Sequence, residues 1–178
     1  VTHRSPARGG KEVPAVDGRA GGRAILGLGA AWNEDEHRAY GIEFPAIKER
    51  MDRLEEALTI CRAMFTEERP SFEGQYYRID RALNSPRPIQ EGGPKILIGG
   101  GGEQRTLKIA AKHADMAHWF PPGVDVLTHK TAVLDSHSAD LRHHMSTPAR
   151  PVATPVLRRR HAQDGARYAD HSPPRRRG

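Results

Sequence analysis

Residues 95–115 read KILIGGGGEQRTLKIAAKHAD: a short apolar run, four glycines and a segment with helical spacing. Glycine loses more conformational freedom on folding than any other residue, so the run at 99–102 needs a structural reason. In α/β proteins, a strand, a glycine turn and a helix often bind phosphate, because backbone N–H groups can approach the anion there. The stretch therefore predicts a phosphate site, with a helix that begins near Glu103 and Arg105 in its first turn. The alternative is a loop that uses glycine only for tight packing.

Strand and helix signals alternate along the rest of the chain. Residues 23–29 (RAILGLG) form a continuous apolar run, typical of a strand buried on both faces. Within residues 45–66, apolar side chains recur at steps of three and four, which predicts an amphipathic helix. Shorter signals predict a hairpin over 70–80, a strand over 116–120 and a weaker helix over 126–141. This alternation is typical of an α/β protein with a parallel sheet.

The chain has 178 residues and a net charge of +6, and the excess of basic residues lies at its two ends. Residues 24–145 contain 15 Lys and Arg against 18 Asp and Glu, and we interpret them as the globular part. Residues 146–178 are rich in Pro and Arg and nearly lack large apolar residues, so we expect a disordered tail. Residues 1–23 show no clean period, which predicts an irregular segment.

Composition disfavours several kinds of protein. The single cysteine, Cys61, excludes a disulfide framework and fits a reducing compartment. No apolar run reaches membrane-spanning length and no signal sequence opens the chain, so we expect a cytoplasmic protein. The Arg-rich tail lacks interleaved aromatic residues and predicts no specific contact with nucleic acid.

No metal site or catalytic acid or base is predicted. The ten histidines are scattered and lack paired spacing with cysteine or carboxylate. Glu34, Asp35 and Glu36 are interpreted as a solvated, charged turn at the start of a helix. The segment GLGAAW at 27–32 lacks the third glycine of a dinucleotide-binding motif.

Three longer segments together resemble one family. They are GGRAILGLGAAWNEDEHRAYGIEFP from residue 21, ERMDRLEEALTICRAMFTEERPSFEGQYYRID from residue 49 and PKILIGGGGEQRTLKIAAKHADMAHWF from residue 94. In this order they resemble the luciferase-like monooxygenase superfamily, especially its members that use the deazaflavin coenzyme F420. The opening VTHRSP is also similar to a strand-end loop of that family.

The resemblance implies a (β/α)8 barrel with its site at the carboxyl ends of the strands. It implies hydride transfer between reduced F420 and a small organic substrate, with FMN as the alternative cofactor. In this family the glycine-rich turn takes the cofactor phosphate, and the loop after the GLG strand lies near the cofactor ring. The implied cofactor-binding residues are Gly99, Gly100, Gly101, Gly102, Arg105, Gly29, Ala30, Ala31, Asn33 and Thr2.

The chain departs from the family in several respects. Members that oxidise a sugar phosphate carry glutamate in place of Ala30, so the resemblance does not extend to that activity. A complete barrel needs about 250 residues, so we expect a truncated member with the C-terminal part of the barrel. Pro14 falls where the family has a regular helix. Open sheet edges would favour a homodimer. The alternatives are an FMN-dependent monooxygenase or a noncatalytic, basic-tailed binding protein on a degenerate scaffold.

Overall fold

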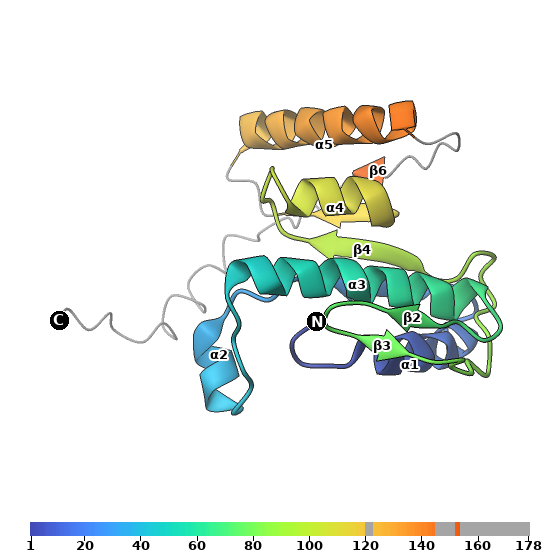
Figure 1. Cartoon of the computed structure of the whole chain (residues 1–178). Helices are drawn as coiled ribbons and strands as arrows, with labels where there is room; N and C mark the ends of the chain where they lie inside the picture. Colours follow the sequence, from blue (N-terminus) through green and yellow to red (C-terminus); the bar gives the residue numbers. More distant parts are fainter. Residues whose placement is uncertain (120–122, 145–151, 154–178) are drawn as a thin grey trace, which may run out of the picture.

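A parallel sheet of four strands forms the centre of the protein (Figure 1). The computed structural model describes residues 1–119, 123–144 and 152–153. The strands lie in the order β1, β4, β5, β6, and each neighbouring pair is parallel. Their bounds are Ile25–Leu28 for β1, Lys95–Gly99 for β4, Met116–His118 for β5 and Val152–Ala153 for β6. The predicted α/β class with a parallel sheet is confirmed.

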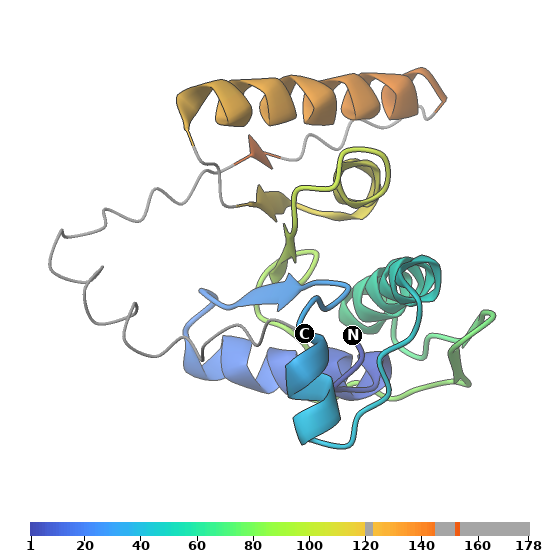
Figure 2. The same ribbon diagram turned by 90° about the vertical axis from the view of Figure 1, so that its left-hand side faces the viewer.

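Helices α1, α3, α4 and α5 follow one another around one side of the sheet (Figure 2). Helix α1 packs on α3, α3 contacts α4, and α4 packs on α5. Their bounds are Pro6–Arg19 for α1, Glu34–Ala39 for α2, Ile47–Thr66 for α3, Thr106–His113 for α4 and Val124–His144 for α5. The predicted hairpin is present as β2 (Phe72–Glu73) and β3 (Arg78–Ile79). None of the described helices is long and apolar enough to cross a membrane.

The core lies between α3, β4, α4 and α5. The apolar stripe predicted for α3 is buried, from Met51 to Phe65. Ile96 and Ile98 are fully buried, because alternate residues of a strand point to the same face. Each such side chain contributes about 1.5–3 kcal/mol through removal from water. Helix α3 and strand β4 are therefore the most firmly held elements of the described fold.

Helix α1 corrects one prediction. Residues 1–23 were expected to be irregular, but residues 6–19 are helical. Gly10 faces α3, where a Cβ atom would lie 3.0 Å from the Cβ of Met64, so this glycine permits close packing of the two helices. Pro14 lies inside the helix and is fully buried. Tertiary packing therefore overrides the poor helix propensity of the segment.

Two further expectations are wrong in part. Strand β1 was expected to be buried on both faces, yet Ile25 is 52% exposed, because β1 is the end strand of the described sheet. Residues 146–178 were expected to be disordered, yet Val152 and Ala153 form β6 beside β5. The rest of this tail lies outside the described residues.

Asp17 fixes the C-terminal part of α1 to two other segments. Its fully buried carboxylate accepts hydrogen bonds from the backbone N–H groups of Ala24, Ile89 and Gln90, at 3.0–3.3 Å. It also accepts one from Gln90 Nε2 at 2.7 Å. Desolvation opposes the charged form, but these donors, led by Gln90, outweigh it and lower the pKa of Asp17. The carboxylate thereby links α1 to the start of β1 and to the connection before β4.

Replacement of Asp17 with asparagine should destabilise the protein by about 2–3 kcal/mol near pH 7, because one N–H group or more loses its acceptor. Since the pKa is lower in the folded state, this carboxylate stabilises the fold fully above its unfolded pKa. That stabilisation is lost as the pH falls through the folded value. The difference in the free energy of unfolding between parent and variant should therefore become smaller as the pH falls. Urea unfolding at a series of pH values from 7 downwards measures this difference.

The exposed Asp135 on α5 provides the matched control. Asp135→Asn should leave the unfolding free energy within about 0.5 kcal/mol of the parent, as for most surface substitutions. A parent and an Asp17→Asn variant of equal stability at pH 7 would show that Asp17 does not hold these segments together.

Candidate active site

The carboxyl ends of β1 and β4 meet at one edge of the sheet. Leu28 pairs with Ile98 in the parallel register, so Gly29 and Gly99 lie side by side. A Cβ atom at Gly29 would lie 3.5 Å from the carbonyl oxygen of Gly99. The N-terminal amino group of Val1 donates to the Gly29 carbonyl oxygen at 3.1 Å, which places Thr2 near the same strand end. The structure thus brings the start of the glycine run, Gly29 and the N-terminal segment that contains Thr2 to one edge of the sheet.

The glycine run packs closely on the start of α4. Gly100 has a φ of +128°, a conformation that side chains rarely adopt, and its N–H donates to the carbonyl oxygen of His118 at 2.8 Å. A Cβ atom at Gly102 would lie 3.0 Å from the hydroxyl oxygen of Thr106. One at Gly101 would lie 3.3 Å from Lys130 Cε and 3.4 Å from Trp119 Cβ. Glycine is therefore required here both by backbone conformation and by close approach.

Helix α4 begins later than predicted, at Thr106 instead of near Glu103. Arg105 is the residue before the first turn, and Glu103 lies in the preceding turn. The helix starts there because the N–H of Leu107 bonds back to the carbonyl oxygen of Gly102 at 2.9 Å. The prediction that both side chains lie in the first helical turn is wrong.

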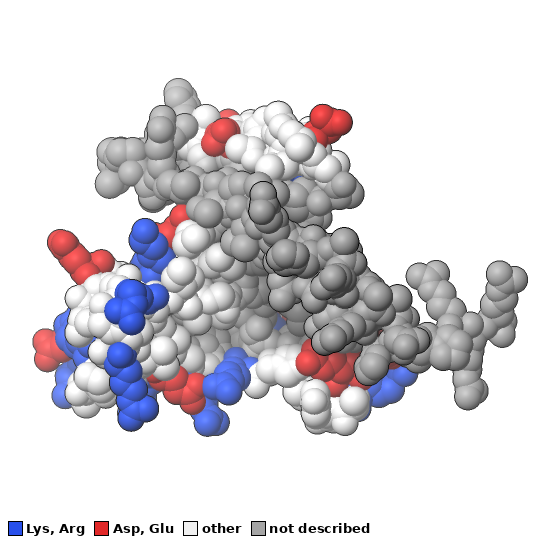
Figure 3. All heavy atoms as spheres, turned by 180° about the vertical axis from the view of Figure 1, so that it is seen from behind, with Lys and Arg blue, Asp and Glu red and all other residues white. Residues whose placement is uncertain are grey.

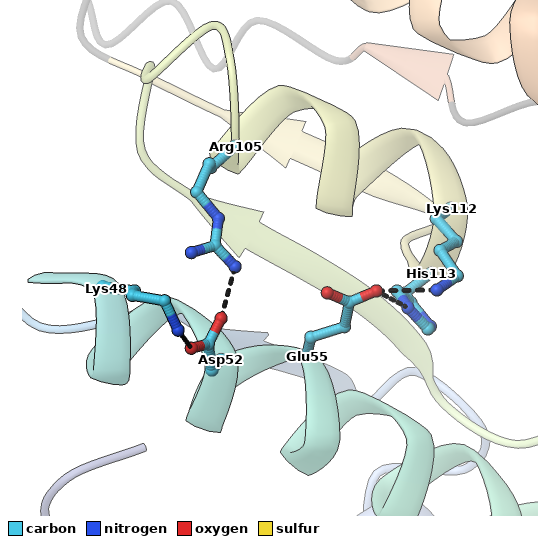
Figure 4. A network of polar contacts seen from close by, with 6 residues as sticks. All are labelled: Lys48, Asp52, Glu55, Arg105, Lys112 and His113. Atoms are coloured by element: carbon cyan, nitrogen blue, oxygen red, sulfur yellow. Dashed lines mark hydrogen bonds and ion pairs between the residues drawn. The ribbon is translucent and has the colours of Figure 1, made fainter.

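The side chain of Arg105 points to helix α3 (Figure 4). Its Nη2 lies 2.6 Å from Asp52 Oδ1, and Lys48 Nζ lies 2.8 Å from the other oxygen of the same carboxylate. Lys48 first, and then Arg105, lower the pKa of Asp52. The Arg105 side chain keeps 42% exposure, so an anion at the strand ends must compete with Asp52 for it.

Lys130, on α5, is a second cation at the glycine run, and the sequence did not single it out. Its Nζ donates to the carbonyl oxygen of Gly101 at 2.6 Å and lies 3.0 Å from Glu103 Oε1. Lys130 and His129 lower the pKa of the Glu103 carboxyl. The only sequence signal would be a lysine on the third element after the glycine run, and lysine is common on helices.

The loop after β1 is held in an unusual backbone conformation. Ala31 has a φ of +69°, which for a residue with a Cβ atom costs roughly 1–2 kcal/mol. The buried guanidinium of Arg50 donates to the carbonyl oxygen of Ala31 at 2.5 Å and to that of Pro45 at 2.9 Å. It also lies 3.9 Å from the centre of the Phe44 ring. Arg50 therefore compensates for the strain and fixes the loop.

Thr2 and Asn33 lie at this loop, but their side chains already have partners. Asn33 Oδ1 accepts the N–H of Glu36 at 3.2 Å and so caps helix α2. Thr2 Oγ1 lies 2.7 Å from Nε2 of the buried His37. The indole of Trp32, in contrast, is 86% exposed in the same loop. Sequence patterns alone did not indicate a role for His37, Trp32 or Arg50 at this loop.

Trp119 supplies a buried donor at the end of β5. Its side chain is 8% exposed, and within the described part of the chain its indole N–H has no hydrogen-bond acceptor. A buried polar group without a partner is costly, and this one belongs to the side chain that a Cβ atom at Gly101 would approach to 3.4 Å. Cys61, in contrast, offers no chemistry here, because burial raises the pKa of its thiol to about 12.

The comparisons with known proteins agree with this geometry. The chain is 44% identical over 81 residues to an F420-dependent glucose-6-phosphate dehydrogenase of Intrasporangium calvum, covering 44% of this chain and 24% of that one. It is 32% identical over 96 residues to an FMNH2-dependent dimethylsulfone monooxygenase of Pseudomonas putida, covering 54% and 26%. The chain thus spans about a quarter of the length of these relatives.

A solved structure of an F420-dependent secondary alcohol dehydrogenase, in complex with an F420–acetone adduct, has the same fold over the matched part. The TM-score is 0.70 at 20% identity, over 79% of this chain and 42% of that one. The family model for luciferase-like monooxygenases matches residues 1–172. The resemblance read from the sequence is confirmed: the chain belongs to the luciferase-like monooxygenase family.

Proposed function

We propose that this chain binds coenzyme F420 at the carboxyl edge of the sheet, as part of an oxidoreductase that acts on a small organic molecule. The observation that carries the proposal is the convergence of the glycine run 99–102 with the loop after β1. In α/β enzymes, a glycine-rich turn between a parallel strand and a helix commonly binds phosphate, because no side chain covers its backbone N–H groups. When bound, the deazaflavin supplies or accepts the hydride.

The residues of this edge fit such a cofactor. Gly101 and Gly102 keep this turn free of side chains, because a Cβ atom at either would lie within 3.4 Å of a neighbouring residue. Among the described residues, the indole N–H of Trp119 has no acceptor. Lys130 and Arg105 are cations within reach of the run, each neutralised by a carboxylate. Arg50 keeps the 30–31 loop in one conformation, which would position the ring without reorganisation on binding. These groups would bind and orient the cofactor and exclude water.

FMN is the alternative cofactor, because it also carries a phosphate and a flavin-type ring that the same residues would bind. Relatives of both kinds exist. F420 is preferred here because the F420-dependent relative is 44% identical in the matched region and the FMNH2-dependent relative is 32% identical. The glucose-6-phosphate activity of the former is not proposed for this chain, because Ala30 departs from the pattern of the sugar-phosphate oxidising members.

We further propose that the four-stranded sheet is part of a (β/α)8 barrel, which the likeness to solved luciferase-like enzymes supports. The exposed side of β1 leaves backbone groups that a second copy could pair with in a homodimer. The noncatalytic alternative depends on the Arg-rich tail, most of which lies outside the described residues. On the face seen in Figure 3, acidic and basic side chains of the described residues lie among one another.

Fluorescence titration of the chain with F420, and in parallel with FMN, tests the proposal. We expect saturable binding in the micromolar range, tighter for F420. Gly101→Val should weaken it by about tenfold or more, because the new side chain occupies the space against Trp119 and Lys130. The matched control is Gly18→Ala on α1, where a Cβ atom meets nothing within 4 Å.

Circular dichroism and thermal melting must show that each variant is folded. The absence of binding to either cofactor would contradict the proposed function. Unchanged affinity in a folded Gly101→Val variant would show that the glycine run is not the phosphate site.

The carboxylate of Asp52 should weaken cofactor binding by competing with the phosphate for Arg105. Asp52→Asn should therefore tighten binding by about two- to fivefold, the range that an exposed ion pair of roughly 0.2–1 kcal/mol allows. In an Arg105→Gln background, Asp52→Asn should leave the affinity for the cofactor unchanged. Equal effects of Asp52→Asn in the two backgrounds, measured by the same titration, would show that Arg105 does not contact the phosphate.

A further inference from the structure

Three potential metal ligands converge next to the β1 loop, although the sequence places two of them far from the third. His3 lies in the N-terminal segment, and Glu36 and His37 lie on α2. One ligand atom from each side chain lies within 4.8 Å of the other two. We propose that His3, Glu36 and His37 form a binding site for a divalent transition metal ion, with zinc as the representative ion.

His37 is oriented as a metal ligand. Its ring is 1% exposed, and its Nδ1 lies 2.6 Å from the carbonyl oxygen of Asn33. A carbonyl oxygen only accepts hydrogen bonds, so Nδ1 carries the proton and Nε2 presents its lone pair. Metal-bound histidines commonly make such a hydrogen bond through the ring nitrogen that does not bind the metal, because it fixes the tautomer and the ring orientation. Phe44 packs edge-on against the same ring, with 4.7 Å between centroids.

The two imidazoles face one point. Thr2 Oγ1 lies 2.7 Å from His37 Nε2 and 3.2 Å from His3 Nδ1, so one oxygen atom reaches both nitrogens. The ring centroids of His3 and His37 are 4.5 Å apart. Zinc binds imidazole nitrogens at about 2.0–2.1 Å, so a small shift of the exposed His3 would let one ion contact both. The Thr2 hydroxyl would then be displaced or would become a further ligand.

The donor set favours a borderline metal ion over calcium or magnesium. Two imidazoles and one carboxylate suit Zn²⁺ and its neighbours, whereas Ca²⁺ and Mg²⁺ prefer oxygen ligands throughout. Three protein ligands leave a fourth position for water. His3 and Glu36 are exposed, so the ion can enter from solvent. The first turn of α2 carries two more acidic residues, Glu34 and Asp35, whose charge is partly compensated by Arg38 at 3.9 and 3.5 Å.

The test is a zinc titration of the untagged chain against a chromophoric chelator at neutral pH, with Co²⁺ absorption as a second readout. We expect one site that competes with the chelator, and visible Co²⁺ bands typical of tetrahedral coordination. His3→Ala and Glu36→Gln should each weaken zinc binding by roughly tenfold or more, because each removes a ligand. Both side chains are exposed, so these variants should fold even if a His37→Ala variant does not.

His129→Ala is the matched control, since His129 is also exposed and also lies beside a glutamate. It should bind zinc as the parent does. Zinc affinity that is unchanged by His3→Ala and Glu36→Gln would overturn the proposal, as would an equal loss in His129→Ala. Either result would mean that the scattered histidines bind zinc nonspecifically. A chain that does not compete with the chelator would overturn it as well.

Discussion

The parallel pairing of β1 with β4 is the constraint on which the candidate active site depends. These strands are separated by about 65 residues, yet their register aligns Leu28 with Ile98. Because both chains run in the same direction, the segments that leave them emerge at the same edge. One segment is the strained loop at Ala31 and the other is the glycine run. Each segment supplies only part of the proposed cofactor site.

The charge arrangement around that edge is close to neutral. Arg105 is paired with Asp52, and Lys130 with Glu103, so the two cations nearest the glycine run are both partly compensated. The four side chains keep between 20% and 42% exposure, which keeps the ion pairs weak and exchangeable. A phosphate that binds here would therefore replace a carboxylate as the partner of each cation, because neither cation is unpaired beforehand. These ion pairs avoid the desolvation free energy that an isolated buried charge would cost the folded protein.

Periodicity and glycine placement predicted the parts of the fold that local rules control. The stripe of α3 and the run KILIG follow from spacing and apolar content, and both are where the sequence predicted them. Helix α1 could not be predicted from local rules, because Pro14 and its glycines oppose helix formation there. The family resemblance placed a helix in this segment, and Gly10 lets it pack closely on Met64 of α3. The register of β1 with β4 was not predicted, because no residue spacing within either strand encodes its pairing with the other.

The polar contacts of the site were the least predictable part. Arg50 falls among charged positions of an amphipathic helix, and only the structure shows its guanidinium buried against two carbonyl oxygens of other segments. The contact of Lys130 with Gly101 joins residues more than 25 positions apart in the chain, and so does the contact of Thr2 with His37. Thr2 belongs to both proposals, as a neighbour of the cofactor edge and of the proposed zinc ligands. A hydroxyl that donates to His37 can only accept from a cofactor, so an ion that displaces it would couple the two proposed sites thermodynamically.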